Sequence, residues 1–414
     1  MEFIEGILEK YPAKWIKRVS IITIGQMLAQ GIGFVFLVIL ARFYLKEDYG
    51  YLRYIINIGS FAAAVVSAGV PTSLARYFAK HKDNKELMDD YFSNGIAINI
   101  FLMACASVVL YAIYQEPLLL IIMLGYSVAG IYQGIIRGLI LYGRIASFQF
   151  VINSLKIVIF LFLVYLLGFS DVKTPLIIYG ATPFLVLLIY MIIFPLGLKF
   201  EIKRINREKA KEVSIFSSWV MISTIANSSI IMAITIALEH SWGFLEVATF
   251  SVAYSMITPF GLVVLGVNLI LLPKIAETDD IIKQAHMVKL SLFYSVFVSL
   301  LFIIVYFLMG DWLIAFLFSS NYTMSYLPMI VMSIGALFMN VRSTFCAYFE
   351  GVGKPYIPTA DIVTAAVISI IFSLIFVPIF GSIAAAWAIL LGFIAACIID
   401  ILAWIVTRKR LFSI

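Results

Sequence analysis

Charged residues are scarce in this sequence, and acidic residues are scarcer than basic ones. Of its 414 residues, 13% are charged and 63% are hydrophobic, and the mean hydropathy is +1.06. A soluble domain carries about 25% charged residues. The chain therefore lacks the polar residues that would cover a water-exposed surface. Its composition excludes a soluble protein and predicts an integral membrane protein.

Cysteine and histidine are scarce as well, with three residues of each type. Cys105, Cys346 and Cys397 lie in apolar stretches without the spacing of metal ligands, so packing is their expected role. No arrangement of a nucleophile and a base is visible, and we expect neither an enzyme nor a bound metal or cofactor. The net charge of +6 does not indicate nucleic-acid binding, because the basic residues lie in short loops between apolar runs.

Long apolar runs, by contrast, follow one another along the whole chain. A membrane-spanning helix needs about 20 predominantly apolar residues, and we count twelve such runs. They lie at approximately 19–41, 54–77, 93–114, 117–138, 149–168, 175–198, 213–237, 246–272, 287–309, 325–349, 356–379 and 382–406. The sequence thus predicts an all-α polytopic membrane protein.

Charged segments divide this array of spans. Residues 1–18 mix apolar and basic positions and are expected to form an amphipathic helix at the membrane interface. We expect one six-helix half over residues 19–198 and a second over residues 213–406. A basic cytoplasmic connector at 199–212 joins the halves, and a short cytoplasmic tail follows at 407–414.

The distribution of Lys and Arg predicts the orientation of the chain. Of the 29 basic residues, 24 lie on the side of the termini, in the terminal segments, the loops of that side and the adjoining ends of the spans, 4 lie in the opposite loops, and Lys156 lies inside a span. Loops on the cytoplasmic side carry the excess of Lys and Arg. We therefore expect a multi-pass protein of the cell membrane with both termini in the cytoplasm.

A short aromatic turn occurs twice, after the first and the seventh span. Residues 45–53 read LKEDYGYLR and residues 238–246 read LEHSWGFLE, with Leu, Gly and Leu identical at matched positions. A Gly followed by a cation also recurs at the cytoplasmic ends of spans 4 and 10, as Gly143-Arg144 and Gly353-Lys354. Because six is an even number, both halves enter the membrane from the same side. The pattern predicts two parallel repeats related by an axis along the membrane normal.

With these landmarks the whole chain resembles the multidrug/oligosaccharidyl-lipid/polysaccharide (MOP) exporter superfamily, and in particular its polysaccharide-flippase branch of the Wzx type. The resemblance rests on the order and spacing of five short motifs. They are Tyr49-Gly50-Tyr51-Leu52, Ala68-Gly69-Val70-Pro71, Ala75-Arg76-Tyr77, Phe318-Ser319-Ser320-Asn321-Tyr322 and Glu350-Gly351-Val352-Gly353-Lys354. The resemblance implies a V-shaped, MATE-like pair of helical bundles around a central cavity.

The same resemblance implies a function. Members of this branch move lipid-linked oligosaccharide or polysaccharide repeat units, carried on polyprenyl or dolichyl phosphate or pyrophosphate, from the cytoplasmic to the outer leaflet. Alternating access of the two halves is the expected mechanism. The alternative is a MATE-type exporter of small molecules or drugs that is coupled to Na⁺ or H⁺. A membrane glycosyltransferase is disfavoured, because the outer loops are short and carry few acids.

Cations within or beside the spans are the first candidates for binding a phosphate headgroup. Intramembrane charges are costly and mark functional sites by default, and the planar guanidinium pairs with phosphate through two hydrogen bonds. The candidates are Lys156, Arg342, Arg53, Arg137 and Arg76. For Lys156 the alternative is snorkelling to the inner headgroups; for Arg76 and Arg137 it is a purely topological role. Arg53 has an acidic residue, Glu47 or Asp48, as its alternative partner.

Amides and acids complete the candidate site. Gln26 and Gln30 share one face of span 1, and Asn227 lies in span 7, the equivalent helix of the second half. They are expected to bind sugar, with interhelical hydrogen bonding as the alternative. Asp361 and Asp400 are candidates for coupling to Na⁺ or H⁺, with pairing to a basic side chain as the alternative. The expected partners are the lipid-linked glycan, membrane lipids and glycan-assembly enzymes, with a monomer as the functional unit.

Overall fold

The computed structural model describes residues 13–67, 69–278 and 280–412, and their regular structure is entirely helical. Of the predicted interfacial segment 1–18, residues 1–12 lie outside the described residues. Residues 13–18 form the start of the first helix. Residues 413–414 of the predicted tail also lie outside them. The all-α prediction is confirmed.

The first half of the chain forms seven helices. They are α2 (Ala13–Phe43), α3 (Lys46–Ser67), α4 (Val70–Lys80), α5 (Lys85–Tyr114), α6 (Pro117–Gly138), α7 (Tyr142–Leu167) and α8 (Lys173–Ile193). The connector contains η1 (Ile202–Arg204). It is followed by α9 (Arg207–Trp242), α10 (Phe244–Ala276), α11 (Ile281–Leu317), η2 (Ser320–Ser325), α12 (Tyr326–Gly351) and α13 (Tyr356–Phe412).

The described helices form the twelve expected spans, but two of the helical regions do not correspond to one helix per span. Ten helices are long and apolar enough to cross a membrane, and α3 with α4 forms one further span that is bent by 42°. The bend follows from Gly69, whose φ of 75° suits glycine, and from Pro71 at the start of α4. The second departure is α13, which reverses direction at Gly381. Its two arms run antiparallel and pack on each other, and Ser369 Oγ of the first arm donates to the Ala388 carbonyl of the second at 2.8 Å.

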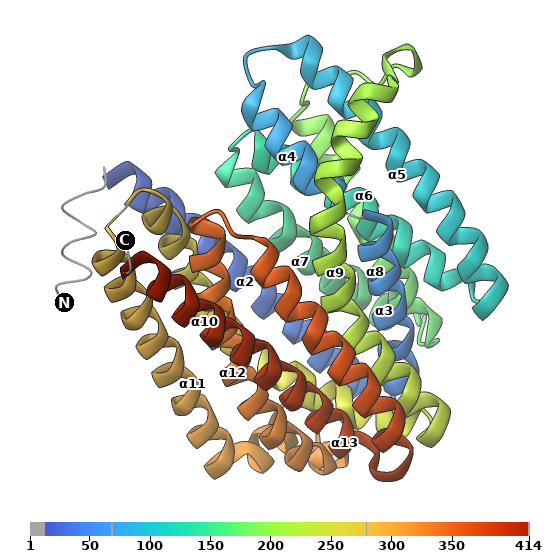
Figure 1. Ribbon diagram of the computed structural model, residues 1–414. Helices are drawn as coiled ribbons and strands as arrows, with labels where there is room; N and C mark the ends of the chain where they lie inside the picture. Colours follow the sequence, from blue (N-terminus) through green and yellow to red (C-terminus); the bar gives the residue numbers. More distant parts are fainter. Residues whose placement is uncertain (1–12, 68, 279, 413–414) are drawn as a thin grey trace.

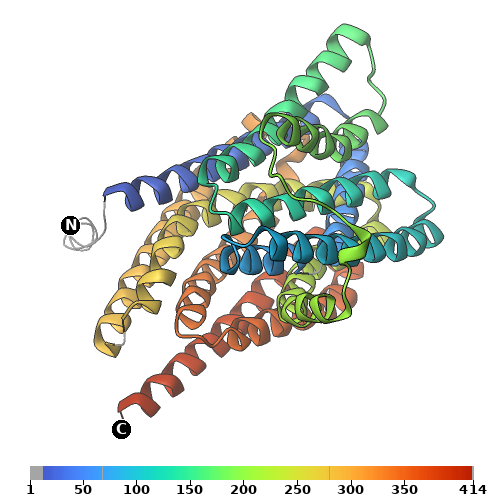
Figure 2. The same ribbon diagram turned by 90° about the horizontal axis from the view of Figure 1, so that it is seen from above.

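The helices form two bundles that meet at one end and diverge at the other. In Figure 1 the end of the first bundle that carries α4 and the start of α5 lies apart from the start of α11 and the end of α13, and Figure 2 agrees. We call this end the connector end and the opposite one the turn end. At the turn end the rings of Tyr51 and Phe244 pack edge to face with centroids 5.5 Å apart. The two repeated aromatic turns therefore contact each other directly.

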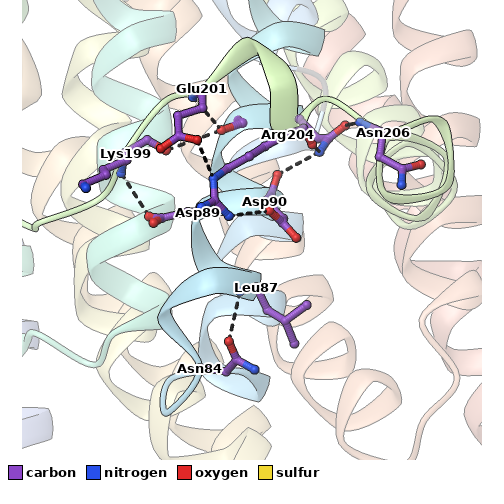
Figure 3. Close-up of polar contacts among 10 residues, drawn as sticks. Asn84, Leu87, Asp89, Asp90, Lys199, Glu201, Arg204 and Asn206 are labelled. Atoms are coloured by element: carbon purple, nitrogen blue, oxygen red, sulfur yellow. Dashed lines mark hydrogen bonds and ion pairs between the residues drawn. The ribbon is translucent and has the colours of Figure 1, made fainter.

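The segment that joins the halves is bound to the first bundle (Figure 3). The backbone N–H groups of Lys199 and Asn206 donate to Asp89 Oδ1 and Asn94 Oδ1, each at 3.0 Å. Arg204 forms an ion pair with Asp90 at 2.9 Å, and this hydrogen bond raises the pKa of its guanidinium. Asp89 and Asn94 are buried. The start of α5 thus holds the connector in a defined path.

The helix α9 packs on both bundles. Near its start, Ser217 Oγ lies 2.7 Å from Ser73 Oγ of α4. Further along, α9 packs against α13, and Trp242 Nε1 donates to the Val377 carbonyl at 2.9 Å. The helix α9 therefore connects the two bundles.

Candidate functional site

A cavity of about 270 Å³ lies between the two bundles. It is lined by α3 from the first bundle and by α9, α10, α12 and α13. Its polar lining consists of amides and hydroxyls, namely Asn57, Ser60, Asn227, Ser228 and Tyr254. The remaining described lining residues are apolar and none of them is charged. The site therefore offers neutral hydrogen-bonding groups beside apolar surface.

Polar contacts around this cavity connect the bundles. Asn57 Nδ2 donates to Thr235 Oγ1 of α9 at 3.1 Å. Arg53 lies four residues before Asn57, on the same face of α3, and is only 6% exposed. It lies within electrostatic range of Tyr254, a lining residue, and of Tyr49. The structure thus places Arg53 in the interface between the bundles, on the turn-end side of the cavity.

Lys156 lies inside the first bundle and is not among the residues that line the cavity. Its Nζ donates to Tyr126 Oη at 2.6 Å and to Asn153 Oδ1 at 3.1 Å, and it lies 4.0 Å from the ring centre of Tyr179. Asn153 in turn donates to the Ala29 carbonyl of α2 at 2.7 Å. The ammonium, 3% exposed, therefore links α6, α7 and α8 and, through Asn153, α2.

Arg342 belongs to a buried charge cluster inside the second bundle. Its guanidinium donates to Asp361 Oδ1 at 2.8 Å and to the Pro358 carbonyl at 3.1 Å. Asp400, on the other arm of α13, lies beside Asp361. Both carboxyls are fully buried, and neither Asp400 oxygen has a hydrogen-bond partner among the described residues. Two acids and one cation thus share an apolar interior.

The other candidates lie on exposed or partly exposed helix faces. On α2, Gln26 is half-buried and Gln30 is exposed. Asn227 is exposed and lines the cavity. Arg76 and Arg137 are exposed on α4 and α6.

These two helices approach closely at the connector end. A Cβ on Gly138 would lie 2.6 Å from the Ala75 carbonyl oxygen. Because Arg76 and Arg137 adjoin these two residues in the chain, they flank the same helix contact. Both arginines therefore lie at the connector end of the first bundle.

Sequence reasoning missed several residues of the site. Asn57 and Ser60 form a polar stripe with Arg53 on span 2, and their spacing along the helix was a readable signal. Tyr254 of α10 and the rings of Tyr126 and Tyr179 around Lys156 gave no such signal. An aromatic residue in an apolar run is usually a packing residue, and only the tertiary contacts show otherwise.

Comparisons with known proteins agree with this architecture. The chain is 23% identical to an uncharacterized membrane protein of Methanocaldococcus jannaschii, over 94% of this chain and 84% of that protein. It superposes on an inward-facing MATE family transporter of the MOP superfamily with a TM-score of 0.77, at 15% identity, over 96% of this chain and 98% of the other. It superposes on the lipid II flippase MurJ, in an inward closed conformation, with a TM-score of 0.75, at 15% identity, over 92% and 87% of the two chains.

The family model described as polysaccharide biosynthesis protein matches residues 15–277, more than half of the chain. The twelve spans, the two bundles around a cavity and the similar solved structures all agree with that match. The protein is thus a multi-pass membrane protein that belongs to the polysaccharide biosynthesis protein family, and its fold is similar to that of a MATE transporter of the MOP superfamily.

Proposed function

We propose that this protein is a flippase that moves a lipid-linked oligosaccharide or polysaccharide repeat unit from the cytoplasmic to the outer leaflet. The carrier is a polyprenyl or dolichyl phosphate or pyrophosphate, and the protein has no catalytic role. The observation that carries the proposal is the cavity between the bundles, whose polar groups are amides and hydroxyls from both halves. Such groups match the hydroxyls of a sugar, and their positions change when the bundles rock.

Charge and shape support the direction of transport. Most of the basic residues lie in the sequence on the same side as the connector, so we infer that the connector end faces the cytoplasm. The bundles diverge at this end and contact each other at the turn end (Figure 1). A headgroup would therefore enter the space between the bundles from the cytoplasmic leaflet of the cell membrane and leave at the turn end.

Arginines at both ends of this path suit an anionic headgroup. Exposed Arg76 and Arg137 both lie toward the connector end, where they would capture the phosphate. Arg53, buried on the turn-end side of the cavity, would receive it before release. Lys156 and Arg342 have partners inside separate bundles, so in this proposal they support the helices rather than contact the sugar.

The cluster of Asp361, Asp400 and Arg342 favours coupling to protons, in this flippase or in the alternative, a coupled small-molecule exporter. Asp400 has no hydrogen-bond partner among the described residues and lies beside a second buried carboxyl. A proton shared by the two acids would balance the single positive charge of Arg342. A sodium ion suits the cluster less well, because the guanidinium already occupies one Asp361 oxygen and would repel the ion.

Proteoliposomes distinguish the two functions. A tritiated polyprenyl-pyrophosphate oligosaccharide is supplied on one side, and its appearance on the other is measured with an external glycosidase. We expect Asn57→Ala combined with Asn227→Ala to slow flipping about tenfold, since two neutral hydrogen bonds are worth roughly 1–3 kcal/mol together. Asn84→Ala, an exposed amide outside the cavity, is the matched control.

The same assay tests the cations and the alternative. Arg76→Gln with Arg137→Gln is expected to raise the substrate concentration needed for half-maximal flipping, whereas Lys156→Ala and Arg342→Ala are expected to reduce the amount of folded protein. Normal flipping in the Asn57 and Asn227 double variant would remove the support that the cavity gives to the proposal. Dye efflux that follows a pH gradient and depends on Asp400, with no flipping, would establish the exporter instead.

A further inference from the structure

A second cavity, of about 510 Å³, lies on the first bundle between α5, α6 and α8. It shares no lining residue with the cavity between the bundles. Its walls are almost entirely apolar and include Ile96, Met103, Ile131, Ile135, Leu187 and Met191. We call this cavity the lateral groove.

The packing of α5 explains why the groove exists and where it opens. Both α5 and α8 pack against α6, but they make little contact with each other. A slot therefore remains between them with α6 as its floor. Ile100 on one wall is 53% exposed and Met191 on the other is 56% exposed. In a membrane protein such side chains face lipid, so the groove opens sideways into the bilayer.

The segment that leads from α8 into the connector closes one end of the groove. Pro195, Leu196, Gly197 and Leu198 line it there, and the hydrogen bonds of Lys199 to α5 hold this segment in place (Figure 3). The groove is thus an apolar slot that ends at the level of the basic loops.

Two cations stand at the closed end. Lys85 Nζ lies 3.8 Å from the position that a Cβ would take on Gly197. Arg144 packs over the ring of Phe194 at 4.9 Å and donates to its carbonyl at 3.4 Å. Neither side chain forms an ion pair with a described residue. An anion at this end would therefore meet two unneutralised charges.

Tyr132 connects the groove to Arg144. It lines the groove and is only 3% exposed, and its hydroxyl lies close enough to the Arg144 guanidinium to interact with it. Arg144 therefore reaches a residue of the groove wall as well as Phe194.

We propose that the lateral groove binds the hydrocarbon tail of the lipid-linked substrate, with its phosphate on Lys85 and Arg144, as a loading site in the cytoplasmic leaflet. This inference rests on the proposed function. A polyprenyl phosphate has one tail for each phosphate group and fits one slot ending in two cations. A glycerophospholipid has two tails, of which a single slot holds one. From this site the headgroup would pass to Arg76 and Arg137, which lie at the same end of the first bundle.

Photolabelling tests the site directly. The full-length protein in phosphatidylcholine nanodiscs is irradiated with a polyprenyl phosphate that carries a diazirine in its tail, and labelled peptides are identified by mass spectrometry. We expect label on the groove segments of α5, α6 and α8. Polyprenol with the same tail but no phosphate is expected to label about tenfold less, because it lacks the charge-assisted hydrogen bonds.

Substitutions separate a built site from surface adsorption. Met191→Trp on the exposed wall and Ile131→Trp on the floor fill the groove and should each abolish labelling. Leu188→Trp, also on α8 but exposed and outside the groove, should not change it. Lys85→Gln with Arg144→Gln should reduce labelling by phosphate to the level of polyprenol, whereas Lys82→Gln should have no effect. Equal labelling by a diazirine phosphatidylglycerol, or no loss in either Trp variant, would show ordinary boundary lipid and overturn the proposal.

Flipping measurements keep this inference distinct from the proposed function. If Met191→Trp removes the label and flipping of the lipid-linked oligosaccharide continues at the wild-type rate, the groove is not a loading site, although the flippase function stands. If the wild-type protein takes up the polyprenyl phosphate label but flips no lipid-linked sugar, the proposed function fails and the groove remains a tail-binding site.

Discussion

The two glycines of the repeated turn have different physical reasons to be glycine. A Cβ on Gly50 would lie 1.9 Å from the Phe244 carbonyl oxygen, so this position requires close approach of two backbones. A Cβ on Gly243 would meet nothing within 4 Å. Its φ of 74° and ψ of −172° instead belong to a region that only glycine adopts readily. The same sequence pattern therefore has two physical causes. The glycine of the first half permits a close backbone contact, and the glycine of the second half permits an unusual backbone conformation.

Substituting these glycines should separate the two effects. Gly50→Ala is expected to widen the turn end, because the methyl group cannot fit against Phe244. Spin labels at Leu45 and Met324, both exposed, would report longer distances by double electron–electron resonance. Gly243→Ala should leave those distances unchanged and lower the free energy of unfolding by about 1–3 kcal/mol. Unchanged distances in Gly50→Ala would contradict the assignment of this contact.

The two buried aspartates should also respond differently to neutralisation. Asp361→Asn leaves the guanidinium of Arg342 buried without its ion pair, which costs roughly 3–5 kcal/mol. Asp400→Asn leaves the ion pair of Arg342 with Asp361 intact and should be tolerated. Thermal unfolding of both variants in the same detergent gives the comparison. A larger loss of stability for Asp400→Asn would mean that Asp400, and not Asp361, carries the pairing.

At the scale of elements, the connector behaves as part of the first bundle. Asn94 is fully buried and accepts from the Asn206 N–H while donating to the carbonyls of Asp90 and Arg204. Together with the contact between Ser73 and Ser217, this extends the attachment to the first bundle as far as Ser217 of α9. The segment between the halves is therefore held by the first bundle and is not a free loop.

Hydrogen exchange can test the attachment of the connector. Asn94→Ala removes three hydrogen bonds to the backbone, and we expect exchange in residues 199–206 to accelerate about tenfold or more, as for a loss of at least 1.4 kcal/mol. Asn84→Ala is the control on the same helix (Figure 3), because it removes only the cap of α5. Equal acceleration in both variants would indicate general loosening of α5 and no specific attachment.

The whole molecule is organised by contact at the turn end and separation at the connector end. Since transport by alternating access requires the turn end to open, linking it should trap the molecule. A cleavable bifunctional maleimide joining cysteines at Leu45 and Met324, in a background without the three native cysteines, is expected to stop flipping. Cleavage of the linker should restore it. Binding of a polyprenyl phosphate probe should continue in the linked state, and continued flipping would rule out opening at this end.

The amino-acid sequence by itself determined the membrane class, the all-α fold, the twelve spans and the resemblance to polysaccharide flippases. These properties depend on composition, run length and the order of short motifs, all of which are local in the chain. For the candidate site, the sequence predicted which types of residue take part but not which of them lie together. The sequence grouped Lys156 and Arg342 as cavity cations, whereas their ammonium and guanidinium groups have partners inside different bundles.

Only the tertiary structure decided which side chains meet. A helix that is apolar on all sides has no distinct polar face, so its rotation about its own axis cannot be read from the pattern. Rotation and packing brought Asn57 and Tyr254 to the cavity between the bundles, set Asp400 beside Asp361, and left the slot between α5 and α8. In a bilayer, where burial does not distinguish helix faces by hydrophobicity, close packing and interhelical hydrogen bonds make that choice.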